Sequence, residues 1–330
     1  MIFWLNFTIN KFIIYSIKTR LHFALNEGVD FLDKQLAKKM SGAYALMRTP
    51  LKEDGTIDYS VYEKYAEWQS TQCEHLFAVC GSSEMRILSP DERVKLAGLT
   101  VKNSNGSFVV ATGNMADTLE EEKEEIKRLE AAGVDGLVLV TKNTGNDPDL
   151  CVEYLTSLAR TTKLPCMLYE FPGYDYHNIS GELYGRLVET GMFYGIKDTT
   201  CTMADIKEKI AVQGDSNVLQ ANVPLLLEAW KAGARGVMAT PLTCASHLFQ
   251  KMWDEFSSGD LDAAKNTFDL VNILDGCIDS GFNLSAKYLV KLQGFDFMPI
   301  GRNGRCLNEQ RLHALDVFYA WGKEHGIFTR

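Results

Sequence analysis

The sequence contains no basic block, and this absence is the first limit on function. Acidic residues outnumber basic ones by 43 to 34, and the formal net charge at pH 7 is −9. Proteins that bind nucleic acid gather lysine and arginine on one surface, where they neutralise phosphates. We therefore expect no nucleic-acid partner. Apolar residues make up 46% and charged residues 23% of the chain, proportions typical of a globular protein with a substantial core.

Metal-ligand and disulfide patterns are also missing. The eight cysteines are widely scattered without a C-x-x-C pair, and the six histidines show no ligand spacing. Several cysteines, such as Cys80, lie inside apolar runs, which is typical of reduced, buried thiols in a cytoplasmic protein. Reactive or disulfide-bonded cysteine is the alternative. We expect a cytoplasmic location and no bound metal.

A good membrane span is missing as well. Residues 1–17 are apolar but are interrupted by Asn6, Asn10 and Lys11, so they would make a poor span. They lack a basic leading segment and a small-residue cleavage site, so they also make a poor signal peptide. We interpret residues 1–40 as an N-terminal extension, partly helical over residues 31–39, with a targeting or partner-binding role as the alternative. No membrane partner is expected, and a complete domain would start near residue 40.

Beyond residue 41 the apolar pattern becomes regular. Eight short apolar runs typical of strands alternate with stretches whose apolar spacing is near 3.6, which is typical of helices. This count over about 200 residues predicts an α/β fold, a (β/α)₈ TIM barrel over residues 41–245. A doubly wound open sheet is the competitor, but no G-x-G-x-x-G follows the first strand. The predicted strands are residues 43–47, 76–80, 108–112, 136–141, 165–170, 193–197, 217–220 and 236–239.

The remaining residues, 246–330, again show helical spacing. We expect helices over residues 246–256, 261–279, 284–293 and 308–325, and no linker separates them from the barrel. The prediction is therefore a C-terminal helical extension that packs on the barrel.

Chemistry in such a barrel lies where strands meet the loops that follow them. Predicted strand six ends at Lys197. A buried lysine without a partner has a lowered pKa, and its neutral amine can attack a ketone to form a Schiff base. The alternative is a lysine that reaches solvent at the strand end. The other strand ends supply Gly81, Ser82, Ser83 and Glu84, then Tyr169 and Glu170, and finally Thr240.

Together these side chains suit an enzyme that forms a Schiff base with a 2-oxo acid. Lys197 supplies the amine, Ser82 and Ser83 supply donors for a carboxylate, and Tyr169 supplies a phenol that can move protons. Each also has a simple structural interpretation. A Gly-Ser-Ser run is typical of a turn, a tyrosine at a strand end often packs in the core, and a glutamate can cap the next helix.

Residues 41–307 resemble the dihydrodipicolinate synthase/N-acetylneuraminate lyase family of pyruvate-dependent class I aldolases. The lysine and tyrosine motifs, which stand 28 residues apart, are its most specific part. The motifs that carry the resemblance are Ala45-Leu46-Met47-Arg48-Thr49-Pro50, Asp54-Gly55-Thr56-Ile57-Asp58, Gly81-Ser82-Ser83-Glu84, Leu88-Ser89-Pro90-Asp91-Glu92-Arg93, Gly133-Val134-Asp135-Gly136, Leu164-Pro165-Cys166-Met167-Leu168-Tyr169-Glu170-Phe171-Pro172 and Gly195-Ile196-Lys197-Asp198.

The resemblance implies roles for individual residues. Lys197 corresponds to the Schiff-base lysine, Tyr169 to the relay phenol and Ser82 to the relay hydroxyl. Ser83, with its backbone N–H, corresponds to the cradle for the pyruvate carboxylate, and Gly81 in the same loop is a further substrate-binding residue. The family needs no cofactor because the lysine forms the covalent imine. It also implies a homo-oligomer, a dimer or tetramer.

The chain departs from the family's pattern around the distal part of the site. The Gly-Thr-Thr-Gly-Glu loop is one residue shorter, and Lys142-Asn143-Thr144 replaces the Pro-Tyr-Tyr run that supplies a relay tyrosine. Tyr174 stands where the synthases carry an arginine for the second substrate's carboxylate, and a phenol cannot replace a guanidinium fork there. The acidic residues that sialic acid lyases carry after strand seven are absent from Gln220-Ala221-Asn222.

We therefore predict a Schiff-base-forming lyase or aldolase that acts on pyruvate or a related 2-oxo acid and cleaves or forms a 2-keto-3-deoxy acid. Tyr174, Glu170 and Asn222 are the candidates for an altered distal pocket, with Thr240 at the end of strand eight as a further binding residue. One alternative is a 4-hydroxy-tetrahydrodipicolinate synthase, which joins pyruvate and aspartate semialdehyde. Another is a family member without catalysis that acts as a binding protein.

Overall fold

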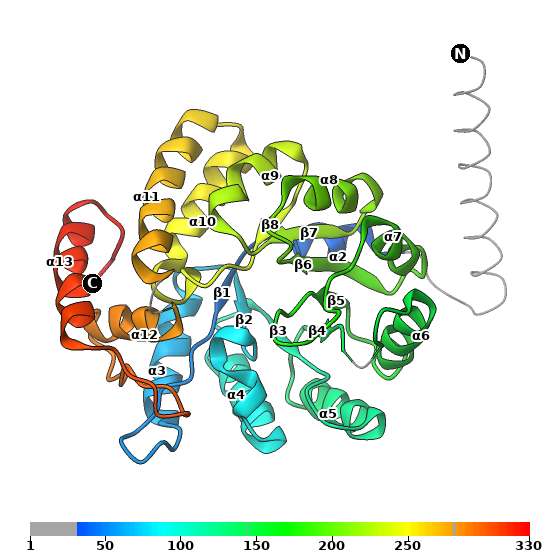
Figure 1. Cartoon of the computed structure of the whole chain (residues 1–330), viewed down its shortest axis with the longest axis horizontal. Helices are drawn as coiled ribbons and strands as arrows, with labels where there is room; N and C mark the ends of the chain where they lie inside the picture. The colour runs from blue at the N-terminus through cyan, green and yellow to red at the C-terminus, as the bar shows by residue number, and fades with distance from the viewer. Residues whose placement is uncertain (1–31, 143, 280–281) are drawn as a thin grey trace.

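The computed structural model describes residues 32–142, 144–279 and 282–330. Eight parallel strands form a closed barrel in which each strand pairs with the next and β8 pairs with β1. Helices surround the strands on all sides (Figure 1). The predicted (β/α)₈ barrel is confirmed. The strands are β1 (Gly42–Leu46), β2 (His75–Phe77), β3 (Phe108–Thr112), β4 (Gly136–Val140), β5 (Cys166–Tyr169), β6 (Phe193–Asp198), β7 (Asn217–Gln220) and β8 (Gly236–Val237).

Helices lie between the strands, as the apolar spacing predicts. They are α3 (Tyr59–Ser70), α4 (Pro90–Lys102), α5 (Leu119–Ala131), α6 (Pro148–Ala159), α7 (Gly181–Glu189), α8 (Met203–Val212) and α9 (Leu226–Ala232). The stretch before α9 differs from a continuous helix. It starts as a 3₁₀ turn, η3 (Val223–Leu225), with a proline at its start. Two further 3₁₀ turns follow β2, η1 (Gly81–Ser83) and η2 (Met85–Ile87).

Helix starts are fixed by side chains that the sequence places just before them. Ser89 accepts a hydrogen bond from the Glu92 N–H, and the Glu92 carboxylate accepts one from the Ser89 N–H, which forms a capping box at α4. Thr118 and Glu121 form the same arrangement at α5. Such a cap is worth about 1 kcal/mol. These caps fix where each loop ends, and therefore which residues remain at the mouth of the barrel.

A short helix, α2 (Lys34–Lys39), covers the amino ends of the strands. The Asn217 side chain donates to the Ala37 carbonyl at 2.8 Å, and the Tyr44 hydroxyl donates to the Met40 carbonyl at 2.9 Å. Ala37 and Met40 are buried. The boundary predicted at residue 40 therefore needs correction, because α2 packs as part of the barrel. Residues 1–31, which hold the rest of the predicted extension, lie outside the described residues.

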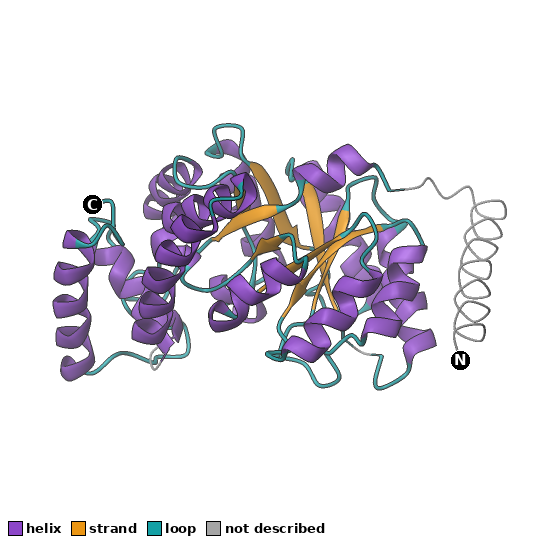
Figure 2. Ribbon diagram, turned by 90° about the horizontal axis from the view of Figure 1, so that it is seen from above, coloured by secondary structure: helices purple, strands orange, loops and turns teal. Residues whose placement is uncertain are grey.

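Four further helices follow β8: α10 (Leu242–Ser258), α11 (Leu261–Asp279), α12 (Phe282–Leu292) and α13 (Glu309–Glu324). Helix α10 begins four residues before its predicted start and contains a kink at Ala245. The α13 helix stands outside the ring at one end of the molecule, as Figures 1 and 2 show. The division of the chain into a barrel and a C-terminal part stays a prediction. No helix in the described ranges is long and apolar enough to cross a membrane.

Candidate active site

Four lysine side chains are buried in the described part of the chain, and they differ in what surrounds the ammonium group. Three lie against a carboxylate. Lys197 is the exception, because its ammonium makes no ion pair or hydrogen bond with any described residue. A buried ammonium without a counter-charge is costly, which is why lysine is rarely buried unpaired. The three pairs are Lys142–Glu122 at 2.6 Å, Lys209–Asp198 at 2.6 Å and Lys287–Glu84 at 2.7 Å.

Aromatic rings surround the Lys197 amine. Its Nζ lies 4.3 Å from the centre of the Tyr169 ring and 5.6 Å from that of the Phe77 ring, and the residue is only 4% exposed. Burial lowers the pKa of Lys197 to about 8. At pH 7 more of this amine is neutral than of an ordinary lysine, although most of it is still protonated, and the neutral form is a competent nucleophile.

Tyr169 lies beside Lys197 because β5 and β6 pair with these two residues in register. Burial raises the pKa of the Tyr169 phenol above its ordinary value. The hydroxyl makes no hydrogen bond with a described residue, so it is free to bond a substrate. A Cβ placed on Gly81 would lie 3.0 Å from Tyr169 Oη, which locates the phenol oxygen against the loop after β2. The structure thus brings together the predicted amine, the phenol and the Gly81 loop.

Ser82 and Thr240 also meet at this mouth. Their hydroxyl oxygens are 3.5 Å apart, although one residue follows β2 and the other follows β8. The Ser82 hydroxyl has no other hydrogen bond among the described residues, so it remains available to a bound carboxylate. The donor role expected of Ser82 stays a prediction.

Ser83 does not point into the mouth. Its hydroxyl accepts from the Cys80 N–H and donates to the Cys80 carbonyl, both at 2.8 Å, and its own N–H donates to the same carbonyl at 3.1 Å. Its carbonyl accepts from the Thr49 hydroxyl. The carboxylate cradle expected at Ser83 therefore needs correction, because every hydrogen-bonding group of this residue is used to hold the shortened loop.

Arg48 contacts this loop, and the sequence did not predict a role for it. Its guanidinium is fully buried, and Nη1 donates to the Ser82 carbonyl at 3.0 Å. The Nε and Nη2 atoms are buried without a partner among the described residues. Burial lowers the pKa of Arg48. The residue lies inside a recognised motif, but nothing in its spacing signals that it supports Ser82.

Glu170 faces away from the mouth, into the layer between the barrel and α8. Its carboxylate lies 2.8 Å from Lys209 and also accepts from the Ile179 N–H at 2.6 Å. Burial raises the pKa of Glu170 to about 7, and the neighbouring Asp198 adds to the rise while Lys209 opposes it. Glu170 is fully buried, so the expected role in the distal pocket is replaced by a structural one. Lys209 ties the ends of β5 and β6, which carry Tyr169 and Lys197.

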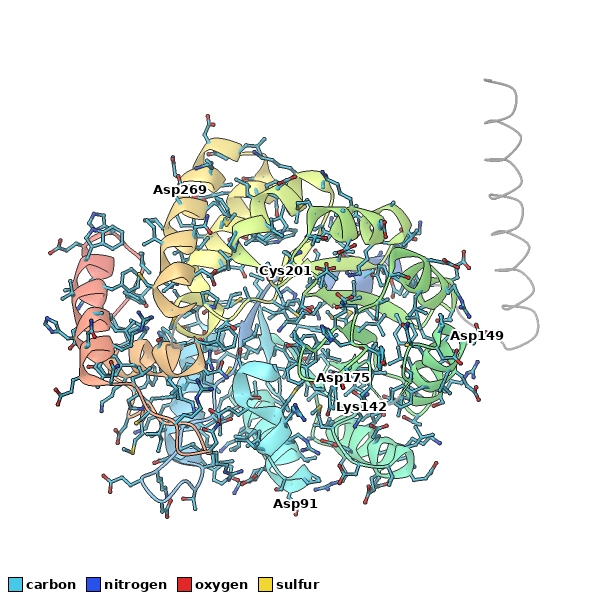
Figure 3. All side chains as sticks on the ribbon, viewed as in Figure 1. Asp91, Lys142, Asp149, Asp175, Cys201 and Asp269 are labelled. Carbon is cyan, nitrogen blue, oxygen red and sulfur yellow. The ribbon has the colours of Figure 1, made fainter. Side chains whose placement is uncertain are left out.

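The remaining predicted residues lie farther out. Tyr174 is half-buried, and the Arg86 guanidinium carbon stands 5.1 Å from the centre of its ring. The Asn222 side chain accepts a hydrogen bond from the Cys201 thiol at 2.8 Å, on the rim between β6 and β7. Figure 3 labels Cys201 and Lys142 on the loops that follow β6 and β4. Lys142 points toward Glu122 of α5, and it also donates to the carbonyl of Ala116, in the loop before α5, at 2.5 Å. Residues 142–144 replace the run in which the family carries a relay tyrosine, and residue 143 lies outside the described residues.

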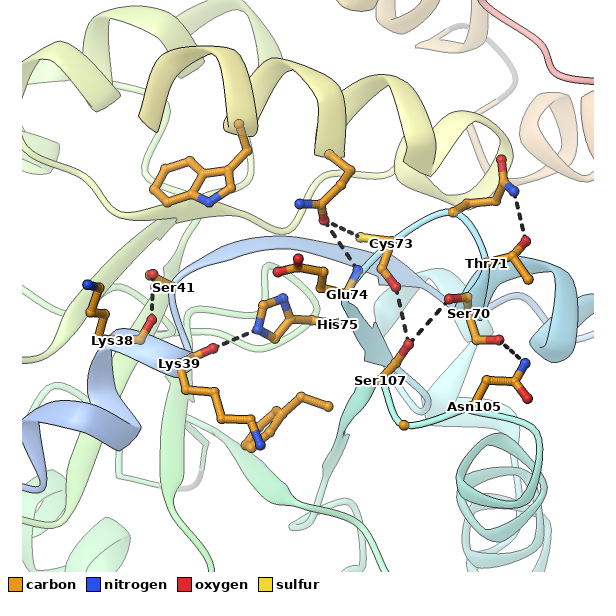
Figure 4. A pocket seen from close by; sticks show the side chains of 15 residues that line it. Lys38, Lys39, Ser41, Ser70, Thr71, Cys73, Glu74, His75, Asn105 and Ser107 are labelled. Atoms are coloured by element: carbon orange, nitrogen blue, oxygen red, sulfur yellow. Dashed lines mark hydrogen bonds between the residues drawn. The ribbon is translucent and has the colours of Figure 1, made fainter. Parts of the chain in front are cut away.

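A cavity opens at the end of the barrel opposite Lys197. It has a volume of about 610 Å³ and is lined by residues such as Lys39, His75 and Trp253 (Figure 4). His75 is the first residue of β2, so this cavity lies at the amino ends of the strands. Chemistry in TIM barrels is found at the carboxyl ends. We therefore assign the catalytic role to the Lys197 end. Within the described ranges, no group of three potential metal ligands comes together.

Comparison with known proteins identifies the family of the chain. Residues 39–305 match the dihydrodipicolinate synthetase family. The chain belongs to this family. Family membership confirms the predicted resemblance and, with it, an enzyme of the lyase and class I aldolase type. The 4-hydroxy-tetrahydrodipicolinate synthase of Psychrobacter arcticus is 28% identical over 261 residues, which cover 78% of this chain and 86% of that protein. The synthase of Geobacter sulfurreducens is 26% identical over 279 residues, 82% of this chain and 91% of that protein.

Solved structures of the family have the same fold. YagE, a prophage protein of the dihydrodipicolinic acid synthase family from E. coli K12 solved in complex with pyruvate, aligns with a TM-score of 0.79 at 20% identity. The alignment covers 86% of this chain and 99% of that one. Dihydrodipicolinate synthase from Aquifex aeolicus aligns with a TM-score of 0.78 at 18% identity, over 88% and 100% of the two chains. At these identities the likeness shows the fold.

Proposed function

We propose that the protein forms a Schiff base between Lys197 and pyruvate or a related 2-oxo acid, and that it cleaves or forms a 2-keto-3-deoxy acid. The observation that carries the proposal is the unpaired, buried amine of Lys197, whose pKa is lowered to about 8 by burial. The pyruvate complex of YagE supports pyruvate as the 2-oxo acid. The enzyme needs no added cofactor in this scheme, since the lysine itself supplies the electrophilic iminium.

In the cleavage direction, the neutral Lys197 amine attacks the C2 carbonyl of the substrate. Tyr169 is a neutral phenol at rest, so it protonates the hydroxyl of the carbinolamine, which leaves as water and gives the iminium. The phenolate then accepts the proton of the C4 hydroxyl as the C3–C4 bond breaks. An aldehyde departs, and the electron pair of the broken bond forms an enamine. Protonation of C3 by Tyr169, followed by hydrolysis, releases pyruvate and restores the amine.

Ser82 and Thr240 hold the substrate carboxylate in this proposal. The Ser82 hydroxyl is available, and the Ser82 carbonyl accepts a hydrogen bond from Arg48 that holds the residue in place. The Thr240 hydroxyl oxygen lies 3.5 Å from that of Ser82. A hydroxyl that is held in place before the substrate arrives costs little further ordering when the carboxylate binds. The shortened loop is thus compatible with a donor on Ser82, while Ser83 keeps the loop in shape.

The test is a coupled assay in which lactate dehydrogenase reports pyruvate released from a panel of 2-keto-3-deoxy acids. We expect release by the wild type, none by Lys197→Met, and a loss of about 10²–10⁴ in kcat for Tyr169→Phe, the usual size of a general acid–base contribution. Release by Lys197→Met equal to that of the wild type would contradict the proposal.

A second candidate is 4-hydroxy-tetrahydrodipicolinate synthase itself, and the names of the relatives favour it. Tyr174 argues against it, because a phenol does not bind a carboxylate as an arginine fork does. An assay with pyruvate, aspartate semialdehyde and the downstream reductase separates the two. Robust turnover there, with no cleavage of keto-deoxy acids, would replace our proposal. A folded protein inactive in both assays would favour a binding protein without catalysis.

We also propose a homo-oligomer, a dimer or tetramer, in the cytoplasm. All eight cysteines are free thiols, which supports a reducing compartment. Light scattering should give a multiple of the 37.0 kDa chain mass. A monomer at micromolar concentration would contradict the assembly.

A further inference from the structure

A pocket of about 460 Å³ adjoins the candidate active site. Gly81 is one of its lining residues, and a Cβ placed on this glycine would lie 3.0 Å from the phenol oxygen of Tyr169. Phe171 also lines the pocket, with its ring centre 5.4 Å from that of Tyr169. The pocket therefore begins where a substrate held on the lysine would extend past the phenol. Its volume is within the range of small-molecule sites.

Two arginines line the pocket, and both keep donors free. Arg305 is exposed, and its guanidinium makes no hydrogen bond with a described residue. Arg86 donates only through Nη1, to the Gly173 carbonyl at 2.8 Å, while its guanidinium rests over the Tyr174 ring. Because the ring and the carbonyl hold Arg86 in place, its remaining N–H groups present a fixed donor edge.

The acidic residue in the wall is already neutralised. Glu84 accepts from Lys287 at 2.7 Å and from the Arg302 N–H at 3.3 Å. The charge that the pocket offers to a ligand is therefore positive. Asn283, also in the wall, has a buried Oδ1 without a partner in the described part of the chain. A buried amide that lacks a partner gains a hydrogen bond when a ligand hydroxyl or amide fills the space.

We infer that this pocket selects an aldehyde portion that ends in an anion, a carboxylate or a phosphate, which Arg305 and Arg86 bind. The inference rests on the proposed function, because it takes the pyruvate end of the substrate to be held on Lys197. It gives the class of substrate: a 2-keto-3-deoxy acid with a second acidic group at the end remote from the keto acid. Arg86 follows β2 and Arg305 follows α12, so neither lies in the loop of Tyr174, and the inferred anion site does not need an arginine at position 174.

The test measures condensation of pyruvate with matched aldehydes. Butanal and succinic semialdehyde differ by a terminal carboxylate, and glyceraldehyde and glyceraldehyde 3-phosphate differ by a phosphate. We expect at least one anionic member to have a kcat/KM at least about tenfold above its neutral match, the size of one charge-assisted hydrogen bond. Arg305→Gln and Arg86→Gln should each raise the KM of the anionic aldehyde about tenfold and leave kcat/KM for the neutral one within twofold. Arg128→Gln, in a surface pair with Asp91, is the matched control and should change neither.

Borohydride trapping of pyruvate on each variant separates the possible failures. If Lys197 is labelled in every variant but neither anionic aldehyde is preferred, the inference is overturned and the proposed function remains. A preference that survives both arginine substitutions would likewise overturn the inference alone. If the folded wild type takes no label at all, the proposed function fails and this inference fails with it. The carboxylate and phosphate arms show which anion the pocket takes.

Discussion

At the scale of single residues, the environment of one ammonium separates Lys197 from the other buried lysines. Below pH 8 the native state buries the Lys197 ammonium without a partner, whereas the unfolded chain keeps it in water with a pKa of 10.5. Between pH 8 and 10.5 the native state binds fewer protons than the unfolded state, so this group's contribution to stability rises with pH. The full penalty applies below pH 8. The group that makes the site reactive therefore also destabilises the fold at neutral pH.

Lys197→Met should consequently make the protein inactive and more stable. At pH 7 we expect a gain on the order of 3 kcal/mol in the free energy of unfolding, which shrinks as the pH rises from 8 toward 10.5. Urea unfolding at pH 7 and pH 9.5 measures it. The matched control is Lys287→Met, which leaves Glu84 short of its counter-charge and should cost about 3 kcal/mol. A Lys197→Met variant that is less stable than the wild type at pH 7 would show that the buried ammonium does not lower the free energy of unfolding.

At the scale of elements, the ends of β5 and β6 are held together by a charge on α8. Lys209 contacts both Glu170 and Asp198, the residues that directly follow Tyr169 and Lys197 in the chain. A fully buried ammonium between two carboxylates fixes the separation of the two strand ends. The position of the phenol relative to the amine therefore depends on a side chain outside the site.

Lys209→Met should break this link. Removing one partner of a buried ion pair leaves uncompensated charge, so we expect a loss of about 3–5 kcal/mol in the free energy of unfolding. We also expect kcat to fall while the variant is still folded, because the amine and phenol are no longer held in register. Adding Glu170→Gln removes one of the stranded charges and should recover part of the stability. No recovery in the double variant would argue against the charge as the cause.

The loop after β2 gives a second prediction at this scale. A Cβ at position 81 would stand 3.0 Å from both Tyr169 Oη and Phe171 Cε2, closer than most side-chain contacts. Gly81→Ala should therefore displace the phenol and lower kcat by about 10²-fold, the usual effect of a 1 Å misplacement. Gly276→Ala, an exposed helical position with nothing within 4 Å of the added carbon, should leave kcat unchanged. Equal activity of Gly81→Ala and wild type would mean that the loop can shift to fit the added carbon without displacing the phenol.

At the scale of the whole molecule, the barrel separates its stability from its chemistry. The helix α2 covers the amino ends of the strands, and Lys197 lies at the carboxyl ends. Ala37→Glu would bury a charge under the barrel and should cost at least about 3 kcal/mol in the free energy of unfolding, without changing kcat of the folded protein. Gln35→Glu, on the exposed face of the same helix, should have little effect. A lowered kcat in Ala37→Glu at a temperature where it is fully folded would contradict this separation.

The sequence predicts this architecture well because strands and helices depend on the local spacing of apolar residues. All eight strands, and the order of Tyr169 and Lys197, follow from apolar spacing and motif order. The support of the site does not, since it depends on contacts between distant residues. Glu84 and its partner Lys287 are 203 residues apart, and Lys209 reaches Glu170 across 39. Nothing local in the sequence distinguishes a glutamate that binds such a partner from one that lines a pocket, and this is why the sequence alone places Glu170 in the distal site.

The most direct test of the central claim is a peptide map of protein reduced with borohydride in the presence of pyruvate. We predict a reduced pyruvyl adduct on the peptide that contains Lys197 and none on Lys142, Lys209 or Lys287, whose ammonium groups are paired. The initial rate of labelling should rise with pH through about 8, as the Lys197 amine loses its proton. An adduct on another buried lysine, or a folded protein that takes no label, would contradict Schiff-base chemistry at Lys197.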